Sequence, residues 1–127
     1  TDHQQKPMAL CWSADGGHTW TSPRTLGEYG VWPCILLLGN GVLVLSYGRP
    51  GVHLRADASG TGERWAEPLT LIAGSHDAVT RDTCGYTSLL PLDERTFLMA
   101  YSDFQHHPTA ADSRHKAILT RRVQVSA

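Results

Sequence analysis

Residues 13–20 read SADGGHTW, and this short stretch decides how the rest of the chain is interpreted. An aspartate follows a serine by two positions, and two glycines separate it from the final histidine, threonine and tryptophan. A short carboxylate can accept hydrogen bonds from backbone N–H groups of its own turn, and glycine permits backbone angles that other residues resist. The stretch therefore predicts a tight turn in which Asp15 has a folding role; the alternative is a catalytic carboxylate.

Part of this stretch recurs along the chain, which indicates an internal repeat. WTSPRTL begins at Trp20 and WAEPLTL begins at Trp65, a shift of 45 residues. In addition, LVLSY at residues 43–47 resembles FLMAY at residues 97–101, a shift of 54 residues. Repeats of about 40–50 residues, each made of about four strands, are typical of β-propeller blades.

The second copy of the opening stretch is degenerate. It reads DASGTGERW over residues 57–65 and keeps Gly62 and Trp65. Gly60 stands where the aspartate would map, unless a shift of one residue places Ser59 there.

Short β-prone segments, punctuated by glycine and proline, fill the remaining sequence. Turn residues at 39–41 (GNG) and 93–95 (DER) predict two hairpins. No segment has a sustained helical stripe, so the pattern predicts an all-β sandwich, barrel or propeller, and the repeat favours the propeller. The expected strands cover residues 8–13, 35–38, 42–47, 52–56, 69–73, 87–90, 96–101 and 116–125.

Size and composition limit the classes of protein that this chain could be. The 127 residues suit about one modest domain, and a hydrophobic content of 41% is enough for a packed core. A net charge of -1 argues against nucleic-acid binding, and no apolar run is long enough to span a bilayer. The chain begins at Thr1 without a basic-then-apolar leader, so we expect a processed protein, an expressed fragment, or a piece of something longer.

Residues 13–20 resemble the Asp box, the S-x-D-x-G-x-T-W repeat of sialidases and related BNR-repeat propellers. The resemblance implies that this turn joins the outer strands of a blade, far from the substrate face, and that its tryptophan packs against the neighbouring blade. It also implies a partial β-propeller, the last two to three blades of a six-bladed ring, with approximate blade pieces at residues 1–32, 33–73 and 74–127. All five fixed positions match: Ser13, Asp15, Gly17, Thr19 and Trp20.

Two further segments resemble parts of a sialidase site. CGYTSL at residues 84–89 is similar to the segment that carries the nucleophilic tyrosine, usually Y-S-x-L, which makes Tyr86 the candidate nucleophile. YGRPGV at residues 47–52 is similar to the end of an inner strand that carries a carboxylate-binding arginine, which makes Arg49 the candidate and Arg55 the alternative. Arginine suits this role because its guanidinium donates paired hydrogen bonds to a carboxylate. The structural alternatives are a tyrosine that packs between blades and a surface arginine near a turn.

The remaining parts of such a site are not evident. Sialidases pair the tyrosine with a glutamate that takes its proton, unlike the usual two-carboxylate glycosidases. If Arg49 matches the arginine after that glutamate's strand, the glutamate's place falls near Trp32 and Pro33, neither of which can act as a base. Glu28 is close in sequence, but nothing matches it to the motif. The acidic proton donor and the first arginine normally lie in early blades, which this sequence lacks.

The resemblance, to a divergent bacterial branch, implies a sialidase-like glycoside hydrolase that acts on terminal acidic sugars, with an incomplete site in these residues. The alternative is a non-catalytic propeller that binds glycans or proteins. The expected partners are a glycan, such as a sialylated one, as substrate or ligand, and either the remaining blades or further copies of the chain. No cofactor, nucleic acid or membrane is expected, and only the resemblance suggests a secreted or periplasmic location.

Cysteines and histidines give weaker signals. Three cysteines, without a CxxC pair, leave both one disulfide and three free thiols open. A polar stretch near the C-terminus gathers histidines and aspartates that could hold a metal, but no spacing fixes them on one face, and the same applies to the pair at residues 76–77. No metal site is therefore predicted. The residues concerned are Cys11, Cys34 and Cys84, and Asp103, His106, His107, Asp112, His115, His76 and Asp77.

Overall fold

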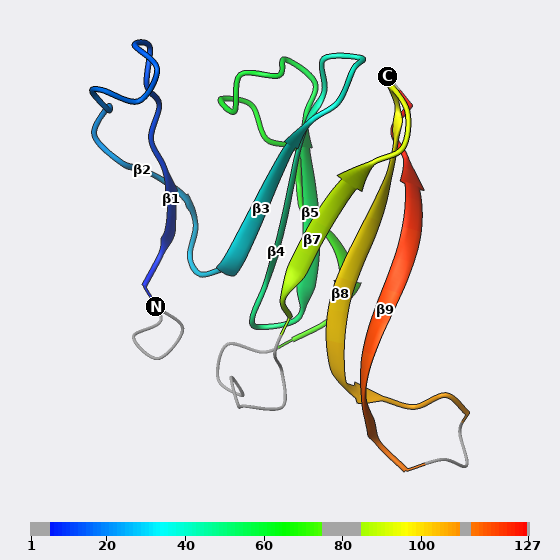
Figure 1. Ribbon diagram of the computed structural model, residues 1–127. Helices are drawn as coiled ribbons and strands as arrows, with labels where there is room; N and C mark the ends of the chain where they lie inside the picture. Colours follow the sequence, from blue (N-terminus) through cyan, green and yellow to red (C-terminus); the bar gives the residue numbers. More distant parts are fainter. Residues whose placement is uncertain (1–5, 75–84, 110–112, 127) are drawn as a thin grey trace.

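A computed structural model describes residues 6–74, 85–109 and 113–126. These residues form nine β-strands and no helix (Figure 1). The predicted all-β class is confirmed, and no helix in the described part of the chain is long and apolar enough to cross a bilayer. The strands are β1 (Met8–Leu10), β2 (Arg24–Gly27), β3 (Val31–Leu37), β4 (Leu43–Gly48), β5 (Val52–Asp57), β6 (Leu69–Ile72), β7 (Thr87–Pro91), β8 (Thr96–His106) and β9 (His115–Gln124).

The strands form three antiparallel sheets in which chain neighbours are also sheet neighbours. Sheet A is β1-β2, sheet B is β3-β4-β5-β6 and sheet C is β7-β8-β9. Both predicted hairpins are confirmed: the N–H of Leu38 donates to the carbonyl of Val42 at 2.9 Å, and the N–H of Leu92 donates to that of Thr96 at 2.8 Å. The expected limit between the first two blade pieces, at 32/33, falls inside β3.

The sequence prediction missed β2, began β3 four residues late and ended β8 five residues early, whereas the strand predicted at 116–125 is displaced from β9 by one residue. Residues 24–27 read RTLG and contain one large apolar side chain, which is too few to show the alternation of a strand. Pairing with β1 nevertheless orders them, because Leu10 lies opposite Arg24 and Ala9 opposite Thr25. Antiparallel pairing likewise carries β8 and β9 further than their apolar residues do, to His106 opposite His115.

Sheet B lies between sheets A and C (Figure 1). Its central strand β4 is therefore buried on both sides and lacks the alternation of a half-exposed strand. Leu45 and Tyr47 pack with Met8 of sheet A. The opposite face packs against sheet C and forms the larger core, made of Leu38, Val42, Val44, Val52, Leu54, Phe97, Met99 and Tyr101.

The echo between residues 43–47 and 97–101 has a structural counterpart. The first segment lies in β4 and the second in β8, and each is the second strand of its sheet. Leu45 and Tyr47 pack against sheet A, and their counterparts Met99 and Tyr101 pack against sheet B, so each pair faces the preceding sheet. The repeated apolar pattern thus marks equivalent positions in sheets B and C.

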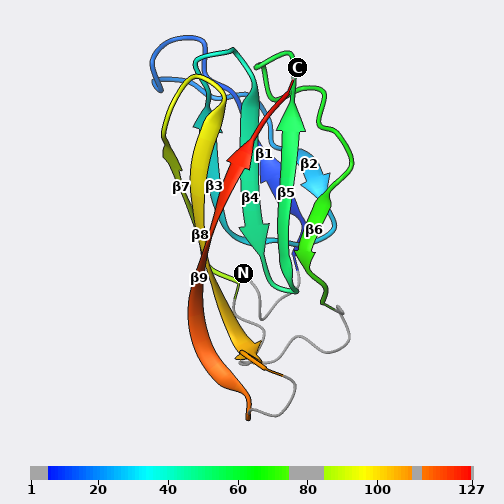
Figure 2. The same ribbon diagram turned by 90° about the vertical axis from the view of Figure 1, so that its right-hand side faces the viewer.

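The outer sheets do not cover sheet B completely. Sheet A has only two strands among the described residues. Ile35 and Leu37 of β3 lie on the same face of sheet B as Leu45, the face turned toward sheet A, and they stay exposed. Sheet C has three strands, and β5 and β6 extend beyond its edge at β9 (Figure 2). Leu69 of β6, which is 60% exposed, lies on this uncovered part.

Candidate functional site

The turn at residues 13–20 closes on the side chain of Asp15. One carboxylate oxygen accepts hydrogen bonds from the hydroxyl of Ser13 at 2.8 Å and the N–H of Thr19 at 2.9 Å. The other accepts the hydroxyl of Thr19 at 2.6 Å, and the N–H of Gly17 donates to the Ser13 hydroxyl at 2.8 Å. Because both carboxylate oxygens are engaged within the turn, the geometry agrees with a folding role for Asp15.

The tryptophan of this turn lies differently from the expected arrangement. The indole N–H of Trp20 donates to the carbonyl of Gly17 at 3.0 Å, and its side chain is 61% exposed. It folds back on its own turn, so no neighbouring sheet among the described residues covers it. In the second copy, Trp65 makes the same bond to Gly62 at 2.8 Å and packs against the cluster that contains Met8.

The comparison of the two copies in the sequence did not identify the carboxylate of the second turn, which belongs to Asp57. Asp57 is fully buried, and its carboxylate accepts hydrogen bonds from the N–H and the hydroxyl of Ser59, at 2.8 and 2.6 Å. It also accepts the N–H of Arg64 at 3.2 Å, the bond that Thr19 makes in the first turn. Neither Gly60 nor Ser59 replaces Asp15: a longer loop lets the last residue of β5 do so. A search for an aspartate shortly before the aligned position could have found it.

Trp12 links the two turns across sheets A and B. Its indole N–H donates to the carbonyl of Thr61 at 2.8 Å, and the guanidinium of Arg24 lies 4.8 Å from the centre of its ring. Arg24 also donates to the carbonyl of Glu63, at 3.4 Å. The two turns therefore serve as a connection between neighbouring sheets.

Hydrogen bonding lowers the pKa of both turn carboxylates. The hydroxyl and N–H of Thr19, followed by the hydroxyl of Ser13, lower the pKa of Asp15 from 3.8 to about 2. Burial by itself would raise the pKa of Asp57, but hydrogen bonds from Ser59 and from the N–H of Arg64 outweigh it and lower the pKa from 3.8 to about 2.

These shifts predict a loss of stability in acid. A carboxyl whose pKa is lower in the folded state stabilises the fold above its unfolded pKa and loses that contribution as pH falls through the folded value. We therefore expect the melting temperature to fall between pH 4 and pH 2, in the range from 3.8 to about 2 set by Asp15 and Asp57. Circular dichroism melts across this range measure the effect. Asp57→Asn should reduce the pH dependence, and an equally steep decline in that variant would contradict the assignment.

The opposite end of sheet B brings together Arg49, Tyr86 and Trp32. Arg49 follows β4, Tyr86 precedes β7 and Trp32 is the second residue of β3. The guanidinium carbon of Arg49 lies 5.9 Å from the centre of the Tyr86 ring. The rings of Trp32 and Tyr86 meet edge to face, with centres 5.3 Å apart. We call these three residues the Arg49–Tyr86 cluster, which combines a cation, a phenol and an exposed indole.

Close contact between the chain segments positions this cluster. Gly48 and Gly85 lie against each other, and a Cβ atom on Gly48 would collide with the carbonyl of Gly85. Behind the cluster, the buried hydroxyl of Ser46 donates to that of Thr87 at 2.8 Å, which donates to the carbonyl of Trp32 at 3.3 Å. These contacts fix the start of β7, and with it Tyr86, against sheet B.

The cluster borders a cavity of about 340 Å³ on the outer face of sheet C. Trp32 and Tyr86 form one wall, and Phe104 and Ile118 contribute to the rest. Tyr86 thus borders an apolar space in addition to its contact with Arg49.

Arg55 does not lie with the cluster. Its three guanidinium nitrogens donate to the carbonyls of Ala66, Leu26 and Trp65 at 2.8, 2.9 and 3.3 Å. These bonds tie β5 to sheet A and to the second turn, so Arg55 has a structural part here. Of the two arginines, Arg49 is the one that lies beside Tyr86.

Glu28 lies in a different groove, of about 420 Å³, between sheets A and B. Tyr47, His53 and Glu67 also line it. Burial raises the pKa of Tyr47, whose ring stacks on His53 with centres 5.1 Å apart. Glu28 therefore lies in another groove than the Arg49–Tyr86 cluster, in which the indole of Trp32 is the neighbour of Tyr86.

The cysteines and the polar C-terminal stretch offer no metal site among the described residues. Cys11 and Cys34 are free thiols, and Cys84 lies outside the described residues. Asp103 and His106 approach within 3.5 Å, and His115 lies opposite His106 in the sheet. His107 is in the loop that follows β8. The other candidates, Asp112, His76 and Asp77, also lie outside the described residues.

Comparison with protein-family models, with curated proteins and with solved structures finds no match for this chain.

Proposed function

We propose that the three sheets are consecutive pieces of a sialidase-like β-propeller. One antiparallel strand pair and two antiparallel meanders stack face to face in chain order. The two turns built on Asp15 and Asp57 occupy equivalent places, between β1 and β2 and between β5 and β6. Sheet A then holds the last two strands of a blade, sheet B a whole blade and sheet C the first three strands of the next. The stacking and the repeated turns support this arrangement.

In this propeller we propose a glycoside hydrolase of sialidase type that acts on terminal sugars bearing a carboxylate. The observation that carries the proposal is the meeting of Arg49 and Tyr86, 5.9 Å apart although 37 positions separate them in the sequence. They lie at the end of the blade opposite the Asp-box turns, which is where such a propeller binds its substrate.

Each residue of the cluster has a chemical part in this proposal. Arg49 pairs its guanidinium N–H groups with the sugar carboxylate. The Tyr86 oxygen attacks the anomeric carbon as the glycosidic bond breaks, while a base takes the tyrosine proton and an acid protonates the leaving oxygen, both from other blades; water then releases the sugar from the tyrosine. The neutral phenol does not repel an anionic substrate as a carboxylate would. The indole of Trp32 presents an apolar face for a sugar ring.

The backbone at this end supports a functional role. Among the described residues, Trp32 and Arg49 are the non-glycine residues with positive φ, at 52° and 49°. Residues other than glycine seldom adopt this conformation, and such positions cluster at ligand sites, where the surrounding structure holds them. Both flank Tyr86.

A second function, a non-catalytic glycan-binding propeller, has one observation in its favour. The position that the resemblance gives to the glutamate base falls near Trp32, and the ring of Trp32 lies edge-on to Tyr86. An indole cannot accept the tyrosine proton. A carboxylate from another blade would serve the hydrolase, whereas a site without one would bind the sugar and leave it intact.

Binding of an acidic sugar tests what both functions share. N-acetylneuraminic acid is titrated into the isotope-labelled chain to about 10 mM, since an incomplete site binds weakly. We expect amide and side-chain shifts at Arg49, Tyr86 and Trp32, and none in the turn at residues 13–20. The methyl ester of the same sugar, which lacks the negative charge, is the matched control and should bind at least about tenfold more weakly. Equal binding of acid and ester would contradict the role of Arg49.

A further inference from the structure

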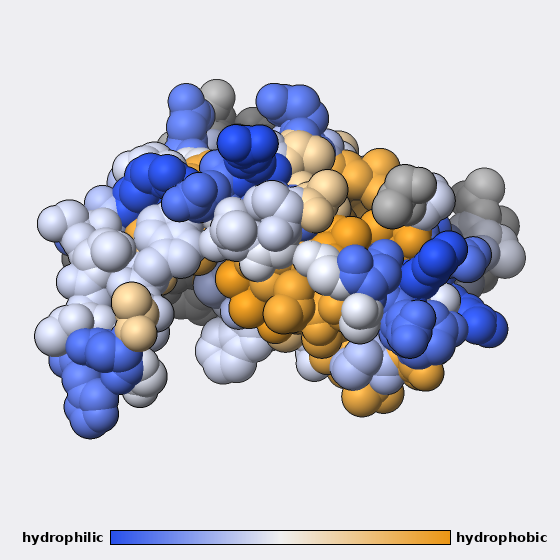
Figure 3. Space-filling view, turned by 90° about the horizontal axis from the view of Figure 1, so that it is seen from above, coloured by the Kyte–Doolittle hydropathy of each residue, from blue (hydrophilic) through white to orange (hydrophobic). Residues whose placement is uncertain are grey.

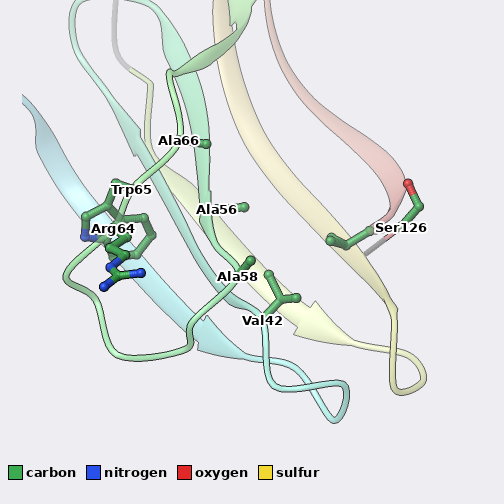
Figure 4. A pocket seen from close by; sticks show the side chains of 8 residues that line it. Val42, Ala56, Ala58, Arg64, Trp65, Ala66 and Ser126 are labelled. Carbon is green, nitrogen blue, oxygen red and sulfur yellow. The ribbon is translucent and has the colours of Figure 1, made fainter.

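The two ends of sheet B have different surfaces. Figure 3 shows the end with the Asp-box turns from above, and hydrophobic surface lies near its middle. An apolar groove of about 360 Å³ lies at this end, with the side chains of Val42 and Ala58 across from Ser126 (Figure 4). Toward the opposite end, which carries Arg49, the groove of about 420 Å³ between sheets A and B is lined by polar side chains as well, among them His53. The polar end thus brings a histidine close to the turn that carries Arg49.

Arg49 lies in a turn of three residues, 49–51, between β4 and β5. The backbone of Arg49 has a φ of 49° and that of Gly51 a φ of 74°, and the N–H of Arg49 donates to the carbonyl of Gly51 at 3.1 Å. Because arginine seldom adopts a positive φ, contacts with the surrounding structure must hold this conformation. A change to the ordinary negative φ would redirect the arginine side chain relative to Tyr86.

His53 contacts this turn through the carbonyl of Pro50. Nε2 of His53 lies 2.8 Å from that carbonyl oxygen, and Pro50 itself is fully buried. A carbonyl oxygen only accepts hydrogen bonds, so Nε2 carries the proton and donates it. Nδ1 lies 3.1 Å from the hydroxyl of Thr70 and is then the acceptor of the neutral ring. The contacts thus define one tautomer, and its N–H group points at the middle residue of the turn.

Sheet B holds the imidazole of His53 in place. His53 lies opposite Tyr47 of β4 on one side and opposite Thr70 of β6 on the other. Its ring stacks on the ring of Tyr47, with centres 5.1 Å apart and an angle of 28° between the planes, and Tyr47 is buried. Stacking and two hydrogen bonds leave the ring little freedom, so its Nε2–H group is a fixed donor.

We propose that His53 is a positioning residue for Arg49. Its hydrogen bond to the carbonyl of Pro50 holds the turn in the conformation in which the guanidinium lies 5.9 Å from the centre of the Tyr86 ring. Without this donor the turn can adopt other conformations, and these separate Arg49 from Tyr86. The inference rests on the proposed acidic-sugar site, in which Arg49 meets the carboxylate of the sugar. His53 acts through the turn and not by contact with the sugar.

Two substitutions of His53 separate the parts of its two ring nitrogens. In His53→Gln the amide nitrogen takes the place of Nε2 and can donate to Pro50, whereas the shorter side chain of His53→Asn reaches only the place of Nδ1. N-acetylneuraminic acid is titrated into the parent and into both variants. We expect its Kd to rise about tenfold in His53→Asn and at most about twofold in His53→Gln, because apparent affinity falls with the fraction of chains whose turn is competent. Equal weakening by both variants would contradict the proposal.

Thr70→Val is the matched control, because it removes the other hydrogen bond of the same ring. Nε2 of His53 keeps its bond to Pro50, and water can donate to Nδ1 in place of the hydroxyl, since this contact is exposed. The Kd of Thr70→Val should therefore stay within about twofold of the parent value. A general loss of order at this edge of sheet B would instead weaken binding as much in Thr70→Val as in His53→Asn, and that result would overturn the proposal.

Spectra of the sugar-free chain separate this inference from the function on which it rests. At about pH 8, where an ordinary histidine is neutral, long-range ¹H–¹⁵N spectra of the parent should show the proton of His53 on Nε2. Nuclear Overhauser contacts should join the side chain of Arg49 to the ring of Tyr86 in the parent and in Thr70→Val, and His53→Asn should lose them. A proton on Nδ1 in the parent, or unchanged contacts in His53→Asn, would overturn the positioning role. A parent chain that shows these contacts and binds no sugar would contradict the proposed function alone.

Discussion

Asp57→Ala is expected to lower the free energy of unfolding by about 3 kcal/mol, the largest stability effect of a single substitution that we predict. The Asp57 carboxylate is fully buried and accepts hydrogen bonds from the N–H groups of Ser59 and Arg64 and from the Ser59 hydroxyl. Alanine leaves these donors without an acceptor in a place that water reaches poorly. Urea unfolding followed by tryptophan fluorescence measures the loss.

The matched control is Asp15→Ala, which removes the corresponding carboxylate from the first turn. That turn is exposed, so water replaces the lost acceptor and the decrease in stability should be smaller than for Asp57→Ala. A loss of sugar binding in Asp15→Ala at unchanged stability would contradict the folding role. An Asp57→Ala variant as stable as the parent would show that the second turn does not depend on its carboxylate.

Tyr86→Phe is expected to lower kcat for a fluorogenic sialoside by about 10³-fold or more, because the substitution removes the attacking oxygen. The phenylalanine keeps the ring against Trp32 and below the guanidinium of Arg49, so sugar binding should change by about twofold at most. Initial rates of the full-length protein, measured beside binding of N-acetylneuraminic acid, separate the two effects.

Each other outcome of this assay has a definite meaning. Sugar binding without turnover by the parent protein would contradict the hydrolase and leave the non-catalytic glycan-binding propeller. Equal turnover by the parent and by Tyr86→Phe would remove Tyr86 from the mechanism. Loss of both binding and turnover would show that the hydroxyl holds the sugar.

The sequence predicted the fold where local chemistry decides it. The turn at residues 13–20 is built from side chains a few residues apart, and the glycines and polar residues at 39–41 and 93–95 determine their hairpins. The sequence-based prediction failed where pairing between distant segments decides whether a strand forms. Residues 24–27 are one such case, because pairing with β1 orders them as β2. The role of Asp57 was not predicted, because the second loop is longer and its carboxylate comes from the last residue of β5.

The candidate site was predicted in part. Arg49 and Tyr86 were chosen from separate segments, and the structure places them side by side. The position of Trp32 could not be predicted, because it depends on a positive φ and on the packing of β3 against β7. The sequence named Arg49 as the candidate and Arg55 as the alternative, and the structural part of Arg55 depends on carbonyls from two distant segments, Leu26 and the pair Trp65 and Ala66.

The contact of Gly48 with Gly85 has a consequence for the history of this protein. A Cβ atom on Gly48 would collide with the carbonyl of Gly85, and one on Gly85 would collide with the carbonyl of Gly51. A single exchange at either place would push sheets B and C apart and separate Arg49 from Tyr86. Lineages that keep the cluster should therefore retain both glycines, and lineages that lost one should show relaxed selection on the arginine and the tyrosine together.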